Sequence, residues 1–274
     1  MKAKGKNVKQ VLSSLLAEKK NPTATKPSAT ITLTNSGTYE VGTILTPAWK
    51  TTFTPGSYTY GPDTGVTDKG GTVTSTKDKV AETIAAGDIN NKTGTFDSYQ
   101  VEDNVTYEAT LSYGWNGGTT TPINNFGDEY IDTANNLPIQ EKSNQVVTSS
   151  NSITGFRKWF KGGLSTNSTT TLTSSVIRSL TGSGSAVTST TFDLSAADYE
   201  GCKRVVIAIP SSSGIDVKQV LLKSASNADI TSEFKAKNTV DVKGAEGYTA
   251  VAYKIWVYEP ASLDSTEVYT ITLG

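Results

Sequence analysis

Two groups of acidic residues are the positions at which this sequence could carry out catalysis. One group is Asp128, Glu129 and Asp132 in the stretch GDEYID, and the other is Asp63 and Asp68 in PDTGVTD. Paired carboxyl groups can act as general acid and base on a glycosidic bond, and carboxylate oxygens can also bind calcium. Neither group has the spacing of an EF-hand or an RTX repeat, and aspartate is also the expected residue of a solvated turn. These acidic residues are compatible with a carboxylate-based glycosidase, but they do not favour that function.

Other catalytic patterns are excluded or incomplete in this sequence. It contains no histidine, which excludes Ser-His-Asp and Cys-His nucleophiles and histidine-containing zinc sites. Gly182 and Gly184 lack the third glycine of a dinucleotide-binding loop, because Val187 occupies that position. Cys202 is the single cysteine; it cannot form an intramolecular disulfide, and we interpret it as a small residue at a strand entrance. We therefore expect no enzyme activity, cofactor or metal.

The stretch ITGFRKWFKGG is the densest aromatic and basic segment of the chain. It interleaves three cations with three aromatic residues, Phe156, Trp159 and Phe160. Such rings could stack on sugars or nucleobases. Alternatively, they could anchor an interface between domains or subunits while the cations stay in solvent. We favour the interface, keep glycan contact as the alternative, and do not expect nucleic-acid binding because the rest of the chain is acidic.

Charge is distributed unevenly along the sequence. Residues 1–27 contain seven lysines and one acid, Glu18, so this segment has a balance of +6. The whole chain has a formal charge of −1, which leaves −7 for residues 28–274. A basic arm on an acidic body is typical of a segment that contacts another molecule.

The basic arm also has the pattern of an amphipathic helix. Five apolar residues recur at helical spacing on one face: Val8, Val11, Leu12, Leu15 and Leu16. Asn7 is a suitable N-cap, and Asn21-Pro22 ends the helix before a proline- and threonine-containing tether. A helix this short is marginal alone in water, so the pattern predicts a docking arm over residues 1–27 that buries its stripe in a partner.

After residue 28 the hydrophobic period changes from that of a helix to that of a strand. TITLTN alternates with Ile31 and Leu33 on one face, and KRVVIAIP, YKIWVYEP and VYTITLG are further strand-length runs separated by turn residues. The stretch DKVAETIAAGDI is the clearest helical candidate in the body. No run approaches the ~20 apolar residues of a membrane span.

These patterns predict a mainly β protein with two antiparallel domains. The low-hydrophobicity stretch 164–191 indicates the boundary between them. We expect a β domain over 28–165 and a β-sandwich-like domain over 166–274, both immunoglobulin-like or jelly-roll-like, preceded by the N-terminal helix on its tether.

Several stretches resemble a known class of proteins. They are TNSGTYEVGTILTPAWKTTFTPGSYTYGPDTGV, SNSITGFRKWFKGG, VIRSLT, CKRVVIAIPSSSGI and VDVKGAEGYTAVAYKIWVYEPAS. Across most of residues 30–274 the chain resembles structural proteins of tailed bacteriophages, with crAss-like and related phages of gut bacteria the nearest likeness. The resemblance implies a virion protein of the head or tail and brings no catalytic residue with it. The arm lies outside the likeness.

Taken together, the arm and the resemblance favour a head fibre or capsid decoration protein located in the virion after synthesis in the host cytoplasm. A tail- or collar-associated fibre or adaptor is the alternative, and a glycan-binding adhesin using Trp115 or Trp159 is an alternative of another class. The expected partners are other capsid, neck or tail proteins and further copies of the chain in a dimer or trimer. A host surface glycan is a further candidate, whereas a membrane is not expected.

Overall fold

The computed structural model describes residues 8–9, 11, 18–77, 82–167, 169–263 and 266–274. The described chain is mainly β with antiparallel sheets, which confirms the fold class predicted from the alternating pattern. It forms two compact units, each assembled from several segments. The first unit contains the chain up to Ser36 together with Thr46–Asp97 and Tyr107–Ser152, and the second contains Gly37–Leu45, Ser98–Thr106 and Ile153–Gly274.

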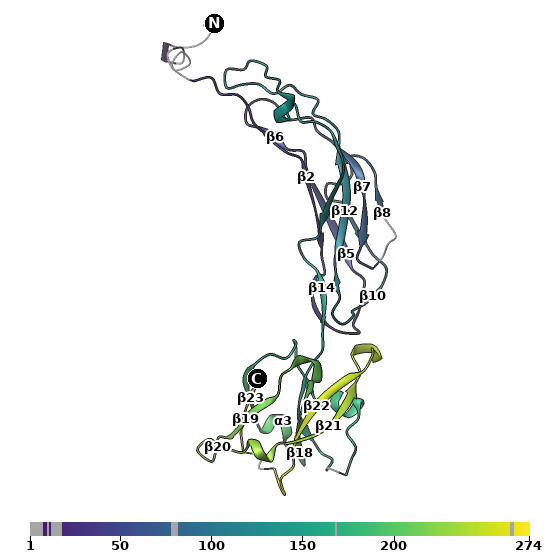
Figure 1. Ribbon diagram of the computed structural model, residues 1–274, viewed down its shortest axis with the longest axis vertical. Helices are drawn as coiled ribbons and strands as arrows, with labels where there is room; N and C mark the ends of the chain where they lie inside the picture. The colour runs from purple at the N-terminus through teal and green to yellow at the C-terminus, as the bar shows by residue number, and fades with distance from the viewer. Residues whose placement is uncertain (1–7, 10, 12–17, 78–81, 168, 264–265) are drawn as a thin grey trace. The chain divides into compact units, whose positions relative to one another are not determined.

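Antiparallel sheets build the first unit (Figure 1). One sheet has the order β2 (Ser28–Leu33), β5 (Ala48–Thr54) and β9 (Thr93–Thr95). The next has the order β13 (Lys142–Thr148), β12 (Ala109–Trp115), β7 (Asp68–Ser75) and β8 (Glu82–Ile84), and a short pair joins β1 (Ala24–Thr25) to β6 (Ser57–Tyr58). The 3-10 helix η1 covers Thr133–Asn135. In β2 the predicted alternation is confirmed, because Ala29, Ile31 and Leu33 are all buried.

The core of the first unit lies where β2 approaches β12 and β13. Aromatic residues fill much of it, with the rings of Trp49 and Phe96 6.5 Å apart and those of Phe96 and Tyr107 6.0 Å apart. Ala109 and Leu111 of β12 are fully buried, as is Tyr107. Each large apolar side chain buried in this way contributes roughly 1.5–3 kcal/mol.

The helix predicted in DKVAETIAAGDI is wrong for its central part. Residues 78–81 lie outside the described residues, and Glu82–Ile84 forms the strand β8. This strand pairs with β7, and its Ile84 side chain is buried. Sheet hydrogen bonds and burial of Ile84 outweigh the weak helix propensity of the segment.

The proline-containing tether lies on the first unit instead of forming a free spacer. Its central residues form β1, which pairs with β6. The backbone N–H of Thr59 donates to the carbonyl oxygen of Thr23 at 2.9 Å, and the two hydroxyl groups are hydrogen-bonded to each other. Pro22 and Pro27 are buried. The sequence suggested a short, semi-extended spacer, but the backbone polar groups of this segment find partners on the unit itself.

Two antiparallel sheets form most of the described part of the second unit. The larger has the order β16 (Thr181–Gly182), β15 (Phe160–Leu164), β18 (Arg204–Pro210), β22 (Val251–Tyr258) and β21 (Lys235–Val242), with β22 and β21 side by side in Figure 1. The smaller has the order β17 (Thr190–Leu194), β23 (Tyr269–Leu273), β19 (Val217–Leu222) and β20 (Ala228–Asp229). Short helices join these strands: α2 (Ser174–Arg178), α3 (Ala196–Tyr199), η2 (Ser211–Ser213), η3 (Thr231–Glu233) and η4 (Ala245–Gly247).

Strand β18 is buried on both faces, as its uninterrupted apolar run RVVIAIP requires. Its residues Val205, Ile207 and Ile209 belong to a core that includes side chains of the smaller sheet. Val206 and Ala208 point the opposite way, into a second core that contains Ile177 of α2. The larger sheet therefore has the smaller sheet on one face and a helix on the other.

Strand β23 occupies an interior position in the smaller sheet. It pairs with β17 on one side and with β19 on the other. Tyr269, Ile271 and Leu273 are buried, which confirms the alternation predicted from VYTITLG. Strand β23 thus links β17 and β19, and both of these strands precede it in the sequence.

Two short segments belong to the second unit although the sequence places them between segments of the first. The segments are residues 37–45 and 98–106. In the first, β3 (Gly37–Glu40) pairs in parallel with β14 (Ile153–Phe156). Also in the first, β4 (Ile44–Leu45) pairs with β10 (Tyr99–Gln100) of the second segment. The two-residue strand β11 (Thr106–Tyr107) crosses the limit between the units. Position 155 of β14 requires glycine, because a Cβ there would collide with the carbonyl oxygen of Glu102.

Candidate functional site

The predicted docking stripe is described only in part. Val8 and Val11 have helical backbone, and Val8 is 76% exposed. Leu12, Leu15 and Leu16 lie outside the described residues, so the N-terminal helix and its stripe stay a prediction. Among the residues that are described, no helix combines the length and the apolar character needed to cross a membrane.

The point at which the arm joins the first unit is held by Asn125. The backbone N–H of Lys20 donates to Oδ1 of Asn125 at 2.8 Å, and the N–H of Asn125 donates to the Lys20 carbonyl at 3.2 Å. Nδ2 of Asn125 also donates to the Glu18 carbonyl at 3.0 Å. The ammonium group of Lys19 lies 3.4 Å from a carboxylate oxygen of Asp128. We name these contacts the Asn125 clamp; they fix where the chain leaves the first unit.

The acids of GDEYID hold loops in place. Asp128 accepts a hydrogen bond from the side chain of Asn124 at 3.1 Å, and this bond, with Lys19, lowers the pKa of Asp128. Asp132 accepts from the side chain of Asn135 at 2.7 Å, which lowers the pKa of Asp132, and it caps η1 by accepting from the backbone N–H of Asn135 at 3.3 Å. A general acid at neutral pH needs a raised pKa, and both carboxyl groups are shifted the other way.

Asp68 of PDTGVTD is also a structural acid. Its carboxylate is buried and accepts hydrogen bonds from the backbone N–H groups of Gly70 and Gly87, both at 2.9 Å. These bonds connect β7 to the turn after β8. Within the described ranges, no three His, Cys, Asp or Glu side chains gather in a way that could hold a metal ion.

The aromatic side chains proposed as interface or glycan contacts present little surface. Phe156 is buried, and Phe160 packs on Tyr253 with their ring centres 6.1 Å apart. Trp159 is half-buried against Phe192, at 5.1 Å. Trp115 is buried in the first unit, where its indole N–H donates to the Gln140 carbonyl, so it is not an exposed ring as the adhesin hypothesis requires.

Two of the cations interleaved with these rings, Arg157 and Lys158, form ion pairs with distant segments of the second unit. Glu40 of β3 lies 3.0 Å from Nζ of Lys158 and 2.6 Å from Nη1 of Arg178, with its own side chain only 9% exposed. We name these three residues the Glu40 cluster. Burial alone raises the pKa of Glu40, but hydrogen bonds and charge attraction from Arg178 and Lys158 exceed that effect and lower the pKa overall.

Arg157 is buried, contrary to the expectation that the cations of this segment stay in solvent. Its Nε donates to Asp103 at 2.7 Å and its Nη1 donates to the carbonyl oxygen of Thr249 at 2.8 Å. Nearby, the Tyr253 hydroxyl donates to the Lys158 carbonyl at 2.7 Å, and burial raises the pKa of Tyr253 well above its usual range. A buried guanidinium needs such partners to offset the cost of its desolvation.

Cys202 occupies the position expected of it, just before β18. Burial raises the pKa of its thiol, and the thiol contacts the Glu200 carbonyl at 3.7 Å. The side chain lies close against Gly163, where a Cβ would collide with its sulfur atom. A raised thiol pKa disfavours the reactive thiolate, and the contact that the structure shows for Cys202 is packing against Gly163.

Sequence reasoning did not single out Asn125, Glu40 or Asp103. Each is a polar residue in a turn or short strand, and its partners lie far away in sequence, so no local motif marks it. Comparison of the chain with family models, with curated proteins and with solved structures gives no match.

Proposed function

We propose that this chain is a non-enzymatic structural protein of a bacteriophage particle, namely a head fibre or capsid-attached decoration protein. The Asn125 clamp carries the proposal. It anchors residues 18–20 to the first unit by backbone and side-chain hydrogen bonds and by the Lys19–Asp128 ion pair. The lysine-rich segment before it therefore starts from a fixed point, as an attachment arm requires.

The architecture of the two units supports a display role. In the second unit a core joins β18 to β17, β19 and β23 of the facing sheet, and we infer a β-sandwich-like arrangement for both units. Sheets closed by such cores hold their shape without a cofactor. Two β units with cores of their own, on a basic arm, fit a protein that attaches to one structure and projects from it.

The acidic residues support the same conclusion. Lowered pKa values at Asp128 and Asp132 follow from hydrogen bonds to Asn124 and Asn135, which keep both groups ionised and engaged in loop structure. A glycosidase needs one carboxyl group that stays protonated near neutral pH. The carboxylate-based glycosidase therefore receives no support from these residues.

The strength of the proposed attachment follows from the stripe. Each of its five apolar side chains contributes roughly 1.5–3 kcal/mol when buried, and loss of conformational freedom offsets a large part of that gain. One arm then binds modestly. Two or three arms in one oligomer gain through avidity, which is why we propose a dimer or trimer.

Immunogold electron microscopy tests the proposal. Antibody raised against residues 28–274 is applied to intact particles of the phage that encodes the chain. Label distributed over the head supports a capsid-attached protein. Label confined to the neck or tail replaces that proposal with the collar or tail adaptor, and absence of label on particles that contain the protein contradicts a projecting body.

Incorporation of variants into particles tests the arm. Leu12→Asp combined with Leu15→Asp should abolish incorporation, because both charges fall on the predicted apolar stripe. The matched control is Gln10→Asp combined with Ser14→Asp, which adds the same charge to the opposite face of the predicted helix and should incorporate normally. Full incorporation of the first variant, measured by mass spectrometry of purified particles, contradicts docking through the stripe.

A further inference from the structure

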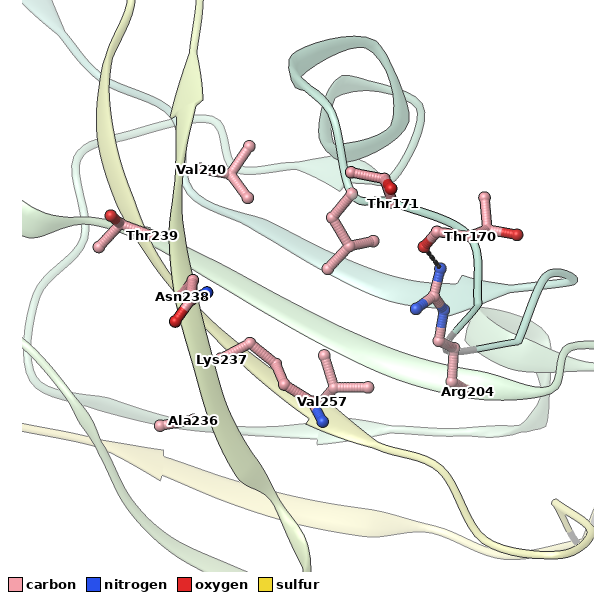
Figure 2. Close-up of a pocket in the computed structure, with 10 residues that line it drawn as sticks. Thr170, Thr171, Arg204, Ala236, Lys237, Asn238, Thr239, Val240 and Val257 are labelled. Atoms are coloured by element: carbon pink, nitrogen blue, oxygen red, sulfur yellow. Dashed lines mark hydrogen bonds between the residues drawn. The ribbon is translucent and has the colours of Figure 1, made fainter.

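A groove lies on the second unit between the loop 170–172 and the strands β21 and β22. Its cavity is about 440 Å³, a volume suited to a small ligand. The floor is apolar, because Val257 lines it and belongs to one core of the unit, with Leu172 and Val240 packed against that core. Figure 2 shows the guanidinium group of Arg204 and the side chain of Lys237 on opposite sides of Val257.

Arg204 is an incompletely satisfied cation in the wall of this groove. It is only 3% exposed, and its Nη2 donates to Oγ1 of Thr166 at 3.2 Å and to the carbonyl oxygen of Thr170 at 3.1 Å. Its buried Nε–H has no hydrogen-bond partner in the described part of the chain. A buried cation with an unsatisfied donor is costly unless an anion compensates it.

The local balance of charge leaves room for one negative group. Glu259 is the acid whose charge acts on Arg204, because the pairing of Val205 with Tyr258 brings the next residue of that chain beside Arg204. Lys237 adds a second cation to the lining. Two cations and one acid leave a net charge of +1, which matches a monoanion better than a dianion.

A strand irregularity completes the polar lining. The pairing of β21 with β22 shifts register between Lys237 and Val240, so Asn238 and Thr239 depart from the regular strand and line the groove. Bulges of this kind redirect side chains and are common beside binding sites. The side-chain amide of Asn238 and the hydroxyl group of Thr239 can each donate and accept hydrogen bonds.

We propose that this groove binds a carboxylate-bearing sugar. The Nε–H of Arg204, which lacks a partner, can donate to a carboxylate in a charge-assisted hydrogen bond, and Lys237 adds charge on the other side. The side chains of Asn238 and Thr239 serve ring hydroxyl groups, and Val257 and Leu172 contact the apolar C–H face of the ring. This ligand class differs from the aromatic-stacking glycan contact considered from the sequence, and it does not depend on the attachment role proposed above.

Titration calorimetry with glucuronate on the full chain tests the proposal, with glucose and inorganic phosphate as comparison ligands. Glucuronate should bind, whereas glucose lacks the carboxylate and phosphate lacks the ring, so both should bind at least several-fold more weakly. Glucose or phosphate binding as tightly as glucuronate would overturn the proposal, and so would absence of glucuronate binding at millimolar concentration.

Two lysine variants connect binding to the groove. Lys237→Gln should weaken glucuronate binding about 2- to 5-fold, because one partly exposed charge is removed. Lys235→Gln, on the same strand but outside the lining, is the matched control and should bind like the unaltered chain. Arg204→Lys keeps the charge but loses the Nε–H donor and should weaken binding further, with circular dichroism checking its fold. Equal affinity of the Lys237 and Lys235 variants contradicts the assignment, whatever the location of the protein in particles.

Discussion

Glutamine in place of Glu40 should destabilise the second unit by about 2 kcal/mol. The substitution keeps the shape of the side chain but removes the negative charge that Lys158 and Arg178 share at 3.0 and 2.6 Å. Loss of one partner from a fully buried pair costs about 3–5 kcal/mol, and loss from an exposed pair costs less than about 1 kcal/mol. The Glu40 side chain is 9% exposed, but the two cations are 34% and 29% exposed, so the expected cost lies between these limits.

Hydrogen exchange of the β18 amides measures this change for the second unit alone. A loss of about 2 kcal/mol corresponds to exchange about 30-fold faster, because each 1.4 kcal/mol is a factor of ten. Asp193→Asn is the matched control in the same unit. Asp193 pairs with Lys223 at 2.6 Å, but both side chains are nearly half exposed, so its exchange should change less than about 5-fold.

The pH dependence gives a second test with a definite sign. The folded-state pKa of Glu40 lies below its ordinary value of 4.5, so its stabilising effect is fully present above pH 4.5 and is lost as pH falls through the lower, folded-state pKa. The difference in protection between Glu40→Gln and the unaltered chain should therefore narrow below pH 4.5. Equal protection in the Glu40 and Asp193 variants at pH 7 refutes a stabilising role of the Glu40 charge. A difference in protection between Glu40→Gln and the unaltered chain that grows below pH 4.5 also refutes it.

Two further substitutions test contacts described above. Asn125→Ala removes the Asn125 clamp and should accelerate trypsin cleavage after Lys19 and Lys20, measured by gel electrophoresis. Cleavage at the rate of the unaltered chain contradicts a fixed point of exit for the arm. Gly155→Ala places a Cβ against the Glu102 carbonyl and should lower the free energy of unfolding by about 1–3 kcal/mol. The control Gly184→Ala, with nothing within 4 Å of its added Cβ, should change it by less than about 0.5 kcal/mol, and equal melting temperatures for the two variants count against the close approach.

Local periodicity predicted the strands because alternation is a property of neighbouring residues. Ile31 and Leu33, and likewise Ile271 and Leu273, are buried where the pattern of period two placed them. The same reasoning failed at Glu82–Ile84, where pairing with β7 and burial of Ile84 decided the structure. Local propensity carries no information about such a partner.

Long-range pairing explains what the sequence did not reveal about the sites. Glu40 and Arg178 are 138 residues apart, and Lys20 and Asn125 are 105 residues apart. Arg204 opens an apolar run and reads as an ordinary strand entrance. The domain limits 28–165 and 166–274 were drawn from composition and stay a prediction. Composition also could not show that residues 37–45 and 98–106 pack with the segment from Ile153 onward.

The interior position of β23 sets the order in which the protein can acquire its structure during synthesis. The segments that build the first unit have all been translated once Ser152 is added. In the second unit, β17 and β19 are joined through β23, which spans Tyr269–Leu273. Their sheet cannot close until that strand has left the ribosome. A ribosome that stalls before residue 269 therefore releases a chain with unpaired strand edges and an open core, a form that cellular proteases can distinguish from the finished protein.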